Sequence, residues 1–174
     1  MDDLTSRIKA GDRAAFRDLV CREQDRMARV AIRMLGDRES ALDAAQEAFI
    51  RVWRARETLD PQMPVAAFLL RVLRNYCIDQ SRASPPAPSM IREDEPSHEA
   101  LPEEISEHRL LADAVRDAVL SLPEPQRSVF ILSHYEGLSY AEVAQLLECP
   151  VGTVASRKQA AIFALRRKLA EWEE

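Results

Sequence analysis

Residues 136–159, EGLSYAEVAQLLECPVGTVASRKQ, predict two helices joined by a tight turn. Ser139 and Glu142 have the spacing of a capping box, so a helix is expected to begin there and to run through Leu147. Pro150 then breaks the chain before a second helix. This order is typical of a helix-turn-helix motif, in which the second helix enters a DNA groove.

Apolar residues repeat at helical spacing in both helices and predict how they pack. The packing residues of the first helix are expected to be Ala141, Val143, Ala144, Leu146 and Leu147. Those of the second helix, which Thr153 is expected to cap and which runs to about Trp172, are Val154, Ala161, Leu165 and Leu169. Near its start, Ser156, Arg157, Gln159 and Ala160 are left facing outward, where such motifs contact base edges. A plain helical hairpin in a core shares this spacing and is the alternative.

Helical patterns fill most of the remaining chain, and with only 4 glycines they predict an all-α protein. Four helices are expected in the first half. The first spans about Leu4–Lys9, and the second is capped by Asp12 and runs through about Leu35 until Gly36 stops it. The third runs from Asp37 or Ser40 to about Arg56, and the fourth from Val65 to about Arg82. In the second half, Ser106 is expected to cap one helix, and Pro123 and Pro125 to start another that ends before Gly137.

Charge divides the chain into three segments. Residues 1–82 carry 15 basic and 13 acidic side chains, residues 83–106 carry 1 and 6, and residues 107–174 carry 8 and 10. The middle segment also holds half of the ten prolines, so it buries too little apolar surface to offset its chain entropy. We therefore expect two small helical domains, 1–82 and 107–174, joined by an extended acidic linker at 83–106.

The sequence has no glycine-rich phosphate loop and no nucleophile placed beside a base in a recognisable catalytic motif. We expect no catalytic residue, no metal site, no cofactor and hence no enzyme. Cys21, Cys77 and Cys149 lack CxxC spacing and are expected to be buried free thiols. Charges interrupt every apolar stretch, and the first ten residues do not form a signal peptide, so we expect a cytoplasmic protein without membrane insertion.

Three stretches resemble bacterial RNA polymerase sigma factors. LPEPQRSVFILSHYEGLSYAEVAQLLECPVGTVASRK, residues 122–158, is similar to their region 4, and both SALDAAQEAFIRVWRARE, residues 40–57, and FLLRVLRNYCIDQSR, residues 68–82, resemble region 2. The two-domain form is that of the extracytoplasmic-function (ECF) group. The resemblance implies an alternative sigma factor that binds core RNA polymerase, directs it to specific promoters and promotes promoter opening.

The resemblance also implies a polymerase-binding face on the helix that carries DAAQEAF. In this family that helix docks on the clamp helices of the polymerase β′ subunit, and the β subunit is a further implied contact. The implied core-binding residues are Asp43, Gln46, Glu47 and Ile50, whose spacing places them on one side of a helix. A solvated charged face is the alternative.

The loop ETLDPQMP and the helix after it correspond in the family to the part that melts and reads the minus-10 element. The implied DNA-binding residues are Arg71, Arg74, Asn75 and Arg82. Arginines supply phosphate contacts and stack on unpaired bases, and an asparagine can bond a base edge. The chain departs from the family pattern FRxWL, since it has Val65, Ala66 and Phe68 there, so we expect a less aromatic pocket.

Region 4 implies that Thr153, Ser156, Arg157, Lys158 and Gln159 read the minus-35 element. Relatives often read GTVKSRLxRAR, whereas Ala155, Ala160 and Ile162 stand here where a basic residue is common. Each missing phosphate contact weakens binding and its salt dependence. Arg157 is therefore the main expected reader, and Lys158 either contacts DNA or lays its stem along the core edge.

The linker and the partners complete the hypothesis. An acidic, proline-rich linker is expected to thread the basic active-site cleft of the polymerase, and a passive tether is the alternative. ECF factors are commonly held by an anti-sigma factor, which is therefore an implied partner beside promoter DNA. Two rival functions remain: a sigma-like interaction module that binds polymerase or an anti-sigma factor without reading DNA, and a helix-turn-helix repressor, which has no use for DAAQEAF.

Overall fold

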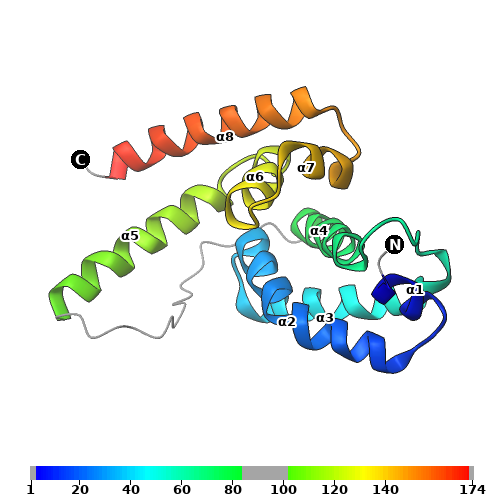
Figure 1. The fold of residues 1–174 in the computed structure, drawn as a ribbon. Helices are drawn as coiled ribbons and strands as arrows, with labels where there is room; N and C mark the ends of the chain where they lie inside the picture. Colours follow the sequence, from blue (N-terminus) through cyan, green and yellow to red (C-terminus); the bar gives the residue numbers. More distant parts are fainter. Residues whose placement is uncertain (1–2, 84–101, 173–174) are drawn as a thin grey trace.

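The computed structural model describes residues 3–83 and 102–172, and these residues form helices and no strand, which confirms the all-α prediction (Figure 1). The N-terminal half contains α1 (Asp3–Lys9), α2 (Arg13–Leu35), α3 (Arg38–Arg54), the short 3₁₀ helix η1 (Arg56–Thr58) and α4 (Val65–Ala83). The C-terminal half contains α5 (Pro102–Leu120), α6 (Glu124–Phe130), the π-helical turn η2 (Ile131–Tyr135), α7 (Tyr140–Leu147) and α8 (Val151–Trp172).

Side-chain caps fix the helix ends in the N-terminal half. The Asp12 carboxylate accepts hydrogen bonds from the amides of Ala14 and Ala15 and starts α2, which ends at Gly36 in the left-handed conformation, φ 77°. Asp37 caps α3 by accepting a bond from the Ser40 amide at 2.7 Å, which decides between the two expected caps. Helix α3 ends at Arg54, slightly before the expected end.

Helices α2, α3 and α4 pack around one core because each presents one apolar face. The buried face of α3 is mostly alanine, which lets its backbone approach the neighbouring helices closely: Ala41, Ala44, Ala45, Ala48, Phe49 and Val52. Leu69 and Leu73 of α4 are fully buried against them. The opposite face of α3 is consequently left to solvent.

The C-terminal half begins earlier than expected. Helix α5 starts at Pro102, so Ser106 lies inside it rather than at its cap, and residues 102–106 are helical where the prediction had extended linker. Residues 84–101, the rest of the expected linker except Ala83, lie outside the described residues. Beyond Phe130 the helix widens into the π turn η2, closed by the bond from the Glu136 amide to the Ile131 carbonyl.

The helix-turn-helix is present with two changes from the prediction. The capping box of Ser139 and Glu142 is confirmed. Helix α8 begins directly after Pro150, whose carbonyl accepts the amides of Thr153 and Val154, so Thr153 lies in the first turn and is not the cap. Ala141, expected to pack, is exposed.

Cysteine environments differ more than expected. Cys21 is exposed on α2, so its predicted burial is wrong, whereas burial raises the pKa of the Cys77 thiol to about 12. Cys149 is half-buried, and all three are free thiols as predicted. Within the described ranges, no helix is both long and apolar enough to cross a membrane.

The two halves are in contact. Helix α2 packs against α5 and η2, and α4 packs against α7 (Figure 1). Gly36, at the end of α2, seats Leu120 of α5 so closely that a Cβ atom added to this glycine would lie 2.5 Å from the leucine Cδ1. The absence of a side chain at this position therefore serves both the helix end and the contact between halves.

Candidate functional site

The outer face of α3 presents the four residues predicted to bind core polymerase. Asp43, Gln46 and Ile50 are exposed, and Glu47 is half-buried because its carboxylate accepts a bond from Arg51 at 2.8 Å. Leu42 is 47% exposed on the same helix and Ile50 is 38% exposed. Exposed leucine and isoleucine beside carboxylate and amide groups form a surface suited to a protein partner. We call Leu42, Asp43, Gln46, Glu47 and Ile50 the α3 face.

Sequence reasoning missed Leu42. The signal for it was available, because Leu42, Gln46 and Ile50 lie at intervals of four residues and so share one side of a helix. Arg51, also exposed on this helix, has its guanidinium 4.8 Å from the centroid of the Tyr76 ring and ties α3 to α4. The helix that carries the α3 face is therefore held against α4 by this contact.

Arg71, Arg74, Asn75 and Arg82 follow one another along α4, and we call them the α4 row. The structure shows that the C-terminal half engages two of them. Arg71 forms an ion pair with Glu148 at 2.8 Å. Arg74 forms one with Glu124 at 2.6 Å and also donates to the Ser128 hydroxyl at 3.2 Å. The predicted DNA contacts are thus assembled on one helix, but their charges are partly neutralised.

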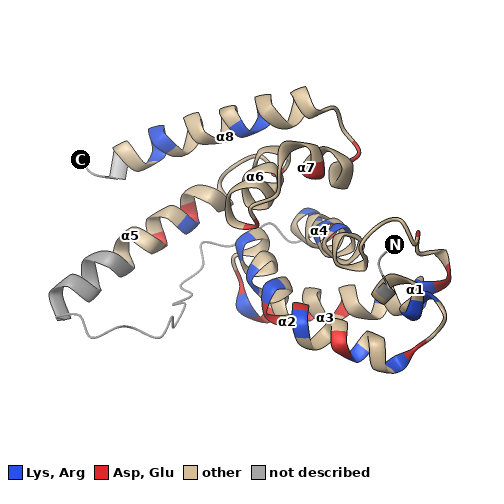
Figure 2. Ribbon diagram, viewed as in Figure 1, with Lys and Arg blue, Asp and Glu red and all other residues tan. Residues whose placement is uncertain are grey.

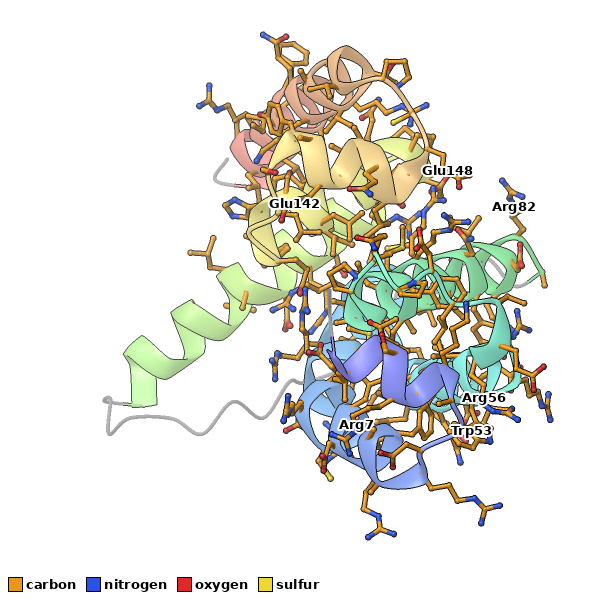
Figure 3. All side chains as sticks on the ribbon, turned by 45° about the vertical axis from the view of Figure 1, so that its right-hand side comes forward. Arg7, Trp53, Arg56, Arg82, Glu142 and Glu148 are labelled. Carbon is orange, nitrogen blue, oxygen red and sulfur yellow. The ribbon has the colours of Figure 1, made fainter. Side chains whose placement is uncertain are left out.

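The other two residues of the α4 row lie differently. Asn75 is exposed, and its side-chain oxygen accepts a bond from Arg74 at 3.1 Å. Arg82 is exposed near the C-terminal end of α4, where Figure 3 shows its side chain projecting from the helix. Asn75 and Arg82 therefore remain accessible to a nucleic acid while Arg71 and Arg74 are occupied.

The loop before α4 is held by the first helix. Thr5 of α1 is fully buried, and its hydroxyl donates to the Met63 carbonyl and accepts from the Val65 amide that begins α4. Lys9 donates to the Leu59 carbonyl at 2.7 Å. Helix α1 thereby fixes the conformation of the loop that the sequence assigns to promoter melting, a role that its sequence did not indicate.

An aromatic surface lies beside this loop. Phe16 and Trp53 have ring centroids 4.9 Å apart and, with Arg13, line an open depression. The Arg56 guanidinium lies 4.8 Å from the centre of the Trp53 ring, and Figure 3 shows these two side chains together. Aromatic rings and arginines can both stack on unpaired bases. The sequence prediction had looked for such groups only at 65–68.

The outer edge of α8 presents the residues predicted to read the minus-35 element. Ser156 and Gln159 are exposed, and Thr153, Arg157 and Lys158 are half-buried. The Lys158 ammonium lies 5.5 Å from the centre of the Tyr140 ring, so this side chain lies along α7 in the free protein. Val154 and Ala161 are fully buried on the opposite side, which confirms the predicted orientation of the helix.

The turn between α7 and α8 has an unusual residue. Glu148 adopts the left-handed conformation, φ 51° and ψ 46°, at the position that ends α7. Glycine or asparagine is the usual choice there, because a Cβ atom is strained in this region. Figure 3 shows Glu148 on the side of the C-terminal half that faces α4, in agreement with its ion pair to Arg71.

Family models match two parts of the chain. The model described as Sigma-70 region 2 matches residues 19–84, and the model described as Sigma-70, region 4 matches residues 112–165. The first therefore contains the α3 face and the α4 row, and the second contains the helix-turn-helix. The order of the two regions is the one expected from the sequence.

Curated relatives align along most of their length. The chain is 31% identical over 175 residues to the ECF RNA polymerase sigma factor SigW of Bacillus subtilis, which covers 94% of each chain. It is 33% identical to the RNA polymerase sigma-H factor of Pseudomonas aeruginosa, with 88% of this chain and 86% of that one covered. It is 35% identical to the ECF RNA polymerase sigma-E factor of Escherichia coli, with the same two shares covered.

Solved structures share the fold. CnrH in complex with the cytosolic domain of CnrY gives a TM-score of 0.75 at 24% identity, with 97% of this chain and 96% of that one covered. The sigma factor RpoE in complex with the anti-sigma factor NepR from Bartonella quintana gives 0.67 at 22% identity, with 89% and 96% covered.

Proposed function

The chain belongs to the ECF group of the sigma-70 family, and from this we propose how it acts as an alternative sigma factor. It binds core RNA polymerase, directs it to promoters with two recognition elements, and promotes opening of the DNA at the minus-10 element. It acts where the polymerase acts, in the cytoplasm, and carries out no bond chemistry of its own. The observation that carries the proposal is the presence of both sigma regions, in family order, on one chain.

We assign the α3 face to the polymerase β′ clamp helices. Leu42 and Ile50 supply apolar contact area. Asp43 and Gln46 supply polar groups at the edge of the interface, which fix how α3 is positioned on the clamp helices. Region 4, residues 107–174, then contacts the β subunit while its helix α8 reads the minus-35 element. Arg157 is the main reader on α8, with Thr153, Ser156, Lys158 and Gln159 beside it.

We assign the α4 row to the minus-10 element. Arg71, Arg74 and Arg82 contact phosphates or stack on unpaired bases, and Asn75 bonds a base edge. The loop at 57–64, fixed by α1, holds the strands apart, and the linker passes through the polymerase cleft. An anti-sigma factor is a further partner, as in the structure of the sigma factor RpoE with the anti-sigma factor NepR.

The test uses the full chain and core polymerase. Transcript starts are mapped after overexpression, and the aligned upstream DNA supplies a promoter for transcription with purified components. We expect a complex with core polymerase in gel filtration and initiation at the mapped starts. Without complex formation the proposal fails.

A second candidate is an interaction module that binds polymerase or an anti-sigma factor but does not read DNA. The observation that favours it is the scarcity of cations on the outer edge of α8, where Ala155, Ala160 and Ile162 replace common basic residues. Core binding together with promoter-independent transcript starts would support this candidate over the first.

A further inference from the structure

Helix α8 carries its basic residues at two places, with an uncharged stretch between them. Basic side chains stand at 157–158 and again at 166–168, whereas residues 159–165, QAAIFAL, carry no charge. Figure 2 shows the same division along the helix, with two basic stretches separated by an uncharged one. The middle of α8 therefore engages its partner without ionic contacts of its own.

Phe163 lies in this uncharged stretch and is open to solvent. It is 70% exposed, more than any other large apolar residue that the structure describes. Single exposed apolar residues are ordinary on protein surfaces, so exposure alone assigns no role to this one. Its position on the helix is what distinguishes it.

The ring stands on the outer side of α8, in line with the proposed minus-35 contacts. Successive helical residues are turned by about 100°, so Phe163 lies within about 40° of both Ser156 and Gln159 around the helix axis. It also lies about 10 Å beyond Ser156 along that axis, at about 1.5 Å per residue. The buried side chains of α8 are on the opposite side: Val154, Ala161 and Leu165. A DNA groove that receives Ser156 and Gln159 therefore receives the ring as well.

The major groove of DNA offers a group that matches the ring. Thymine presents a C5-methyl group there, which distinguishes it from the other three bases, and apolar side chains recognise this methyl group by direct contact. We propose that Phe163 is a specificity-determining residue that packs on the C5-methyl group of one thymine in the minus-35 element. This rests on the proposed function, since it takes the outer side of α8 as the surface that enters the groove.

Cations before and after the ring favour DNA over a protein as its partner. Arg157 precedes Phe163 on the helix, and Arg167 follows it one turn later on the same side and is exposed. Cations at both ends can contact phosphates while an apolar group between them reaches the bases. The α3 face, by contrast, sets two exposed aliphatic residues beside carboxylate and amide groups. A polyanion fits the surroundings of Phe163 better than it fits that face.

An apolar contact also suits a recognition helix with few cations. Contacts to phosphates release counterions and make affinity depend on salt, whereas burial of a methyl group against a ring releases none. The ring thus adds affinity and sequence preference where α8 has lost basic residues, namely at Ala155, Ala160 and Ile162. The expected signature is a preference for thymine at one position that persists at high salt.

The first arm of the test removes one methyl group at a time from the DNA. The full chain is combined with core polymerase, and its affinity for the mapped promoter is measured by anisotropy on labelled duplexes. In each duplex one thymine of the minus-35 element is replaced by uracil, which pairs as thymine does and lacks only the methyl group. We expect one replacement to weaken binding about fourfold. A minus-35 element without thymine, or one in which no replacement has an effect, refutes the proposal.

The second arm removes the ring. Phe163→Ala should bind the unmodified promoter about fourfold more weakly than wild type does, and the sensitive uracil replacement should weaken it no further. Phe163→Leu keeps an apolar side chain and should retain part of the response to uracil. The matched control is Leu110→Ala on α5, where the leucine is 58% exposed, and it should respond to uracil as wild type does. A response that survives Phe163→Ala in full would assign the methyl contact to another residue and contradict the proposal.

Salt dependence separates the ring from the ionic contacts of the same helix. In Phe163→Ala, the slope of the logarithm of affinity against the logarithm of salt concentration should equal that of wild type. In Arg157→Ala/Lys158→Ala the slope should be shallower, because cations that displace counterions are lost. A shallower slope in Phe163→Ala would contradict an apolar contact.

The outcomes separate this proposal from the proposed function. If wild type directs initiation at the mapped starts while Phe163→Ala and wild type respond alike to uracil, the sigma-factor function stands and the methyl contact is refuted. If Phe163→Ala instead loses core binding in gel filtration, the ring docks on polymerase and the methyl contact is again refuted. If wild type directs no initiation, the proposed function fails, and the methyl contact fails with it.

Discussion

The α3 face and the α4 row lie on neighbouring helices of the same half, and the C-terminal half engages two residues of the α4 row, Arg71 and Arg74. Ile50 and Leu42 are open to solvent, whereas Arg71 and Arg74 each form an ion pair with a glutamate of the other half. The proposed polymerase contacts are thus open, whereas two of the proposed DNA contacts are engaged by the C-terminal half. On these proposed assignments, polymerase can bind the α3 face before Arg71 and Arg74 are released.

The largest effect is expected from removing the covered arginines. In transcription with core polymerase at the mapped promoter, Arg71→Ala/Arg74→Ala should lower initiation about 100-fold, because two phosphate or base contacts are lost. Core binding, measured by gel filtration, should remain, since neither residue belongs to the α3 face. Loss of core binding in this variant would break the distinction between the two surfaces.

A charge placed on the uncovered face should have the next largest effect. Ile50→Asp buries an unpaired carboxylate against the polymerase, and we expect about 30-fold weaker binding to core. The control Gln24→Asp adds the same carboxylate to an exposed site on α2 and should bind as wild type does. Binding of the free chain to single-stranded DNA should not change in either variant.

Arg157 tests whether the second DNA surface is already available. Because it is part of the accessible edge of α8, Arg157→Ala should reduce initiation about tenfold at promoters with the cognate minus-35 element. Arg166→Ala, at an exposed position further along the same helix, is the control and should have little effect. Unchanged initiation by Arg157→Ala would favour the interaction module over a DNA reader.

The smallest effect concerns Glu148, the strained residue at the end of α7 that pairs with Arg71 of the α4 row. Both Glu148→Gly and Glu148→Gln remove the ion pair with Arg71, but only glycine relieves the positive φ. In urea unfolding, the glycine variant should be more stable than the glutamine variant by about 1 kcal/mol. The reverse ranking would show that the left-handed backbone carries no strain.

Local signals in the sequence predicted the helices well. Asp12 and the Ser139–Glu142 pair act within a few residues, and the periodicity of apolar residues predicts which side of α8 is buried. Thr153 was misread because Pro150 supplies the carbonyl that accepts the first helical amides, so no threonine cap is needed. Ser106 was misread because the helix had already begun at Pro102.

The site could be predicted only in part. Apart from Leu42, the residues of the α3 face and the α4 row follow from family motifs, and the structure places each set on one helix. The ion pairs of the α4 row do not follow from the sequence, because Arg71 and Glu148 are far apart along the chain and Arg74 and Glu124 are separated by 50 positions. Ion pairs between residues so far apart along the chain cannot be predicted from the periodicity of a single sequence. The net charges of the two halves, +2 and −2, were the one available hint of attraction between them.

The π turn at Ile131–Tyr135 has a consequence for insertions and deletions. It holds one residue more than an ordinary helical turn, and its C-terminal end presents Tyr135 and the following Glu136 to α2. Removing one residue from this turn would rotate all that follows by about 100° and carry both side chains away from α2. The alignment of the halves thus depends on the number of residues in this turn as well as on their identity.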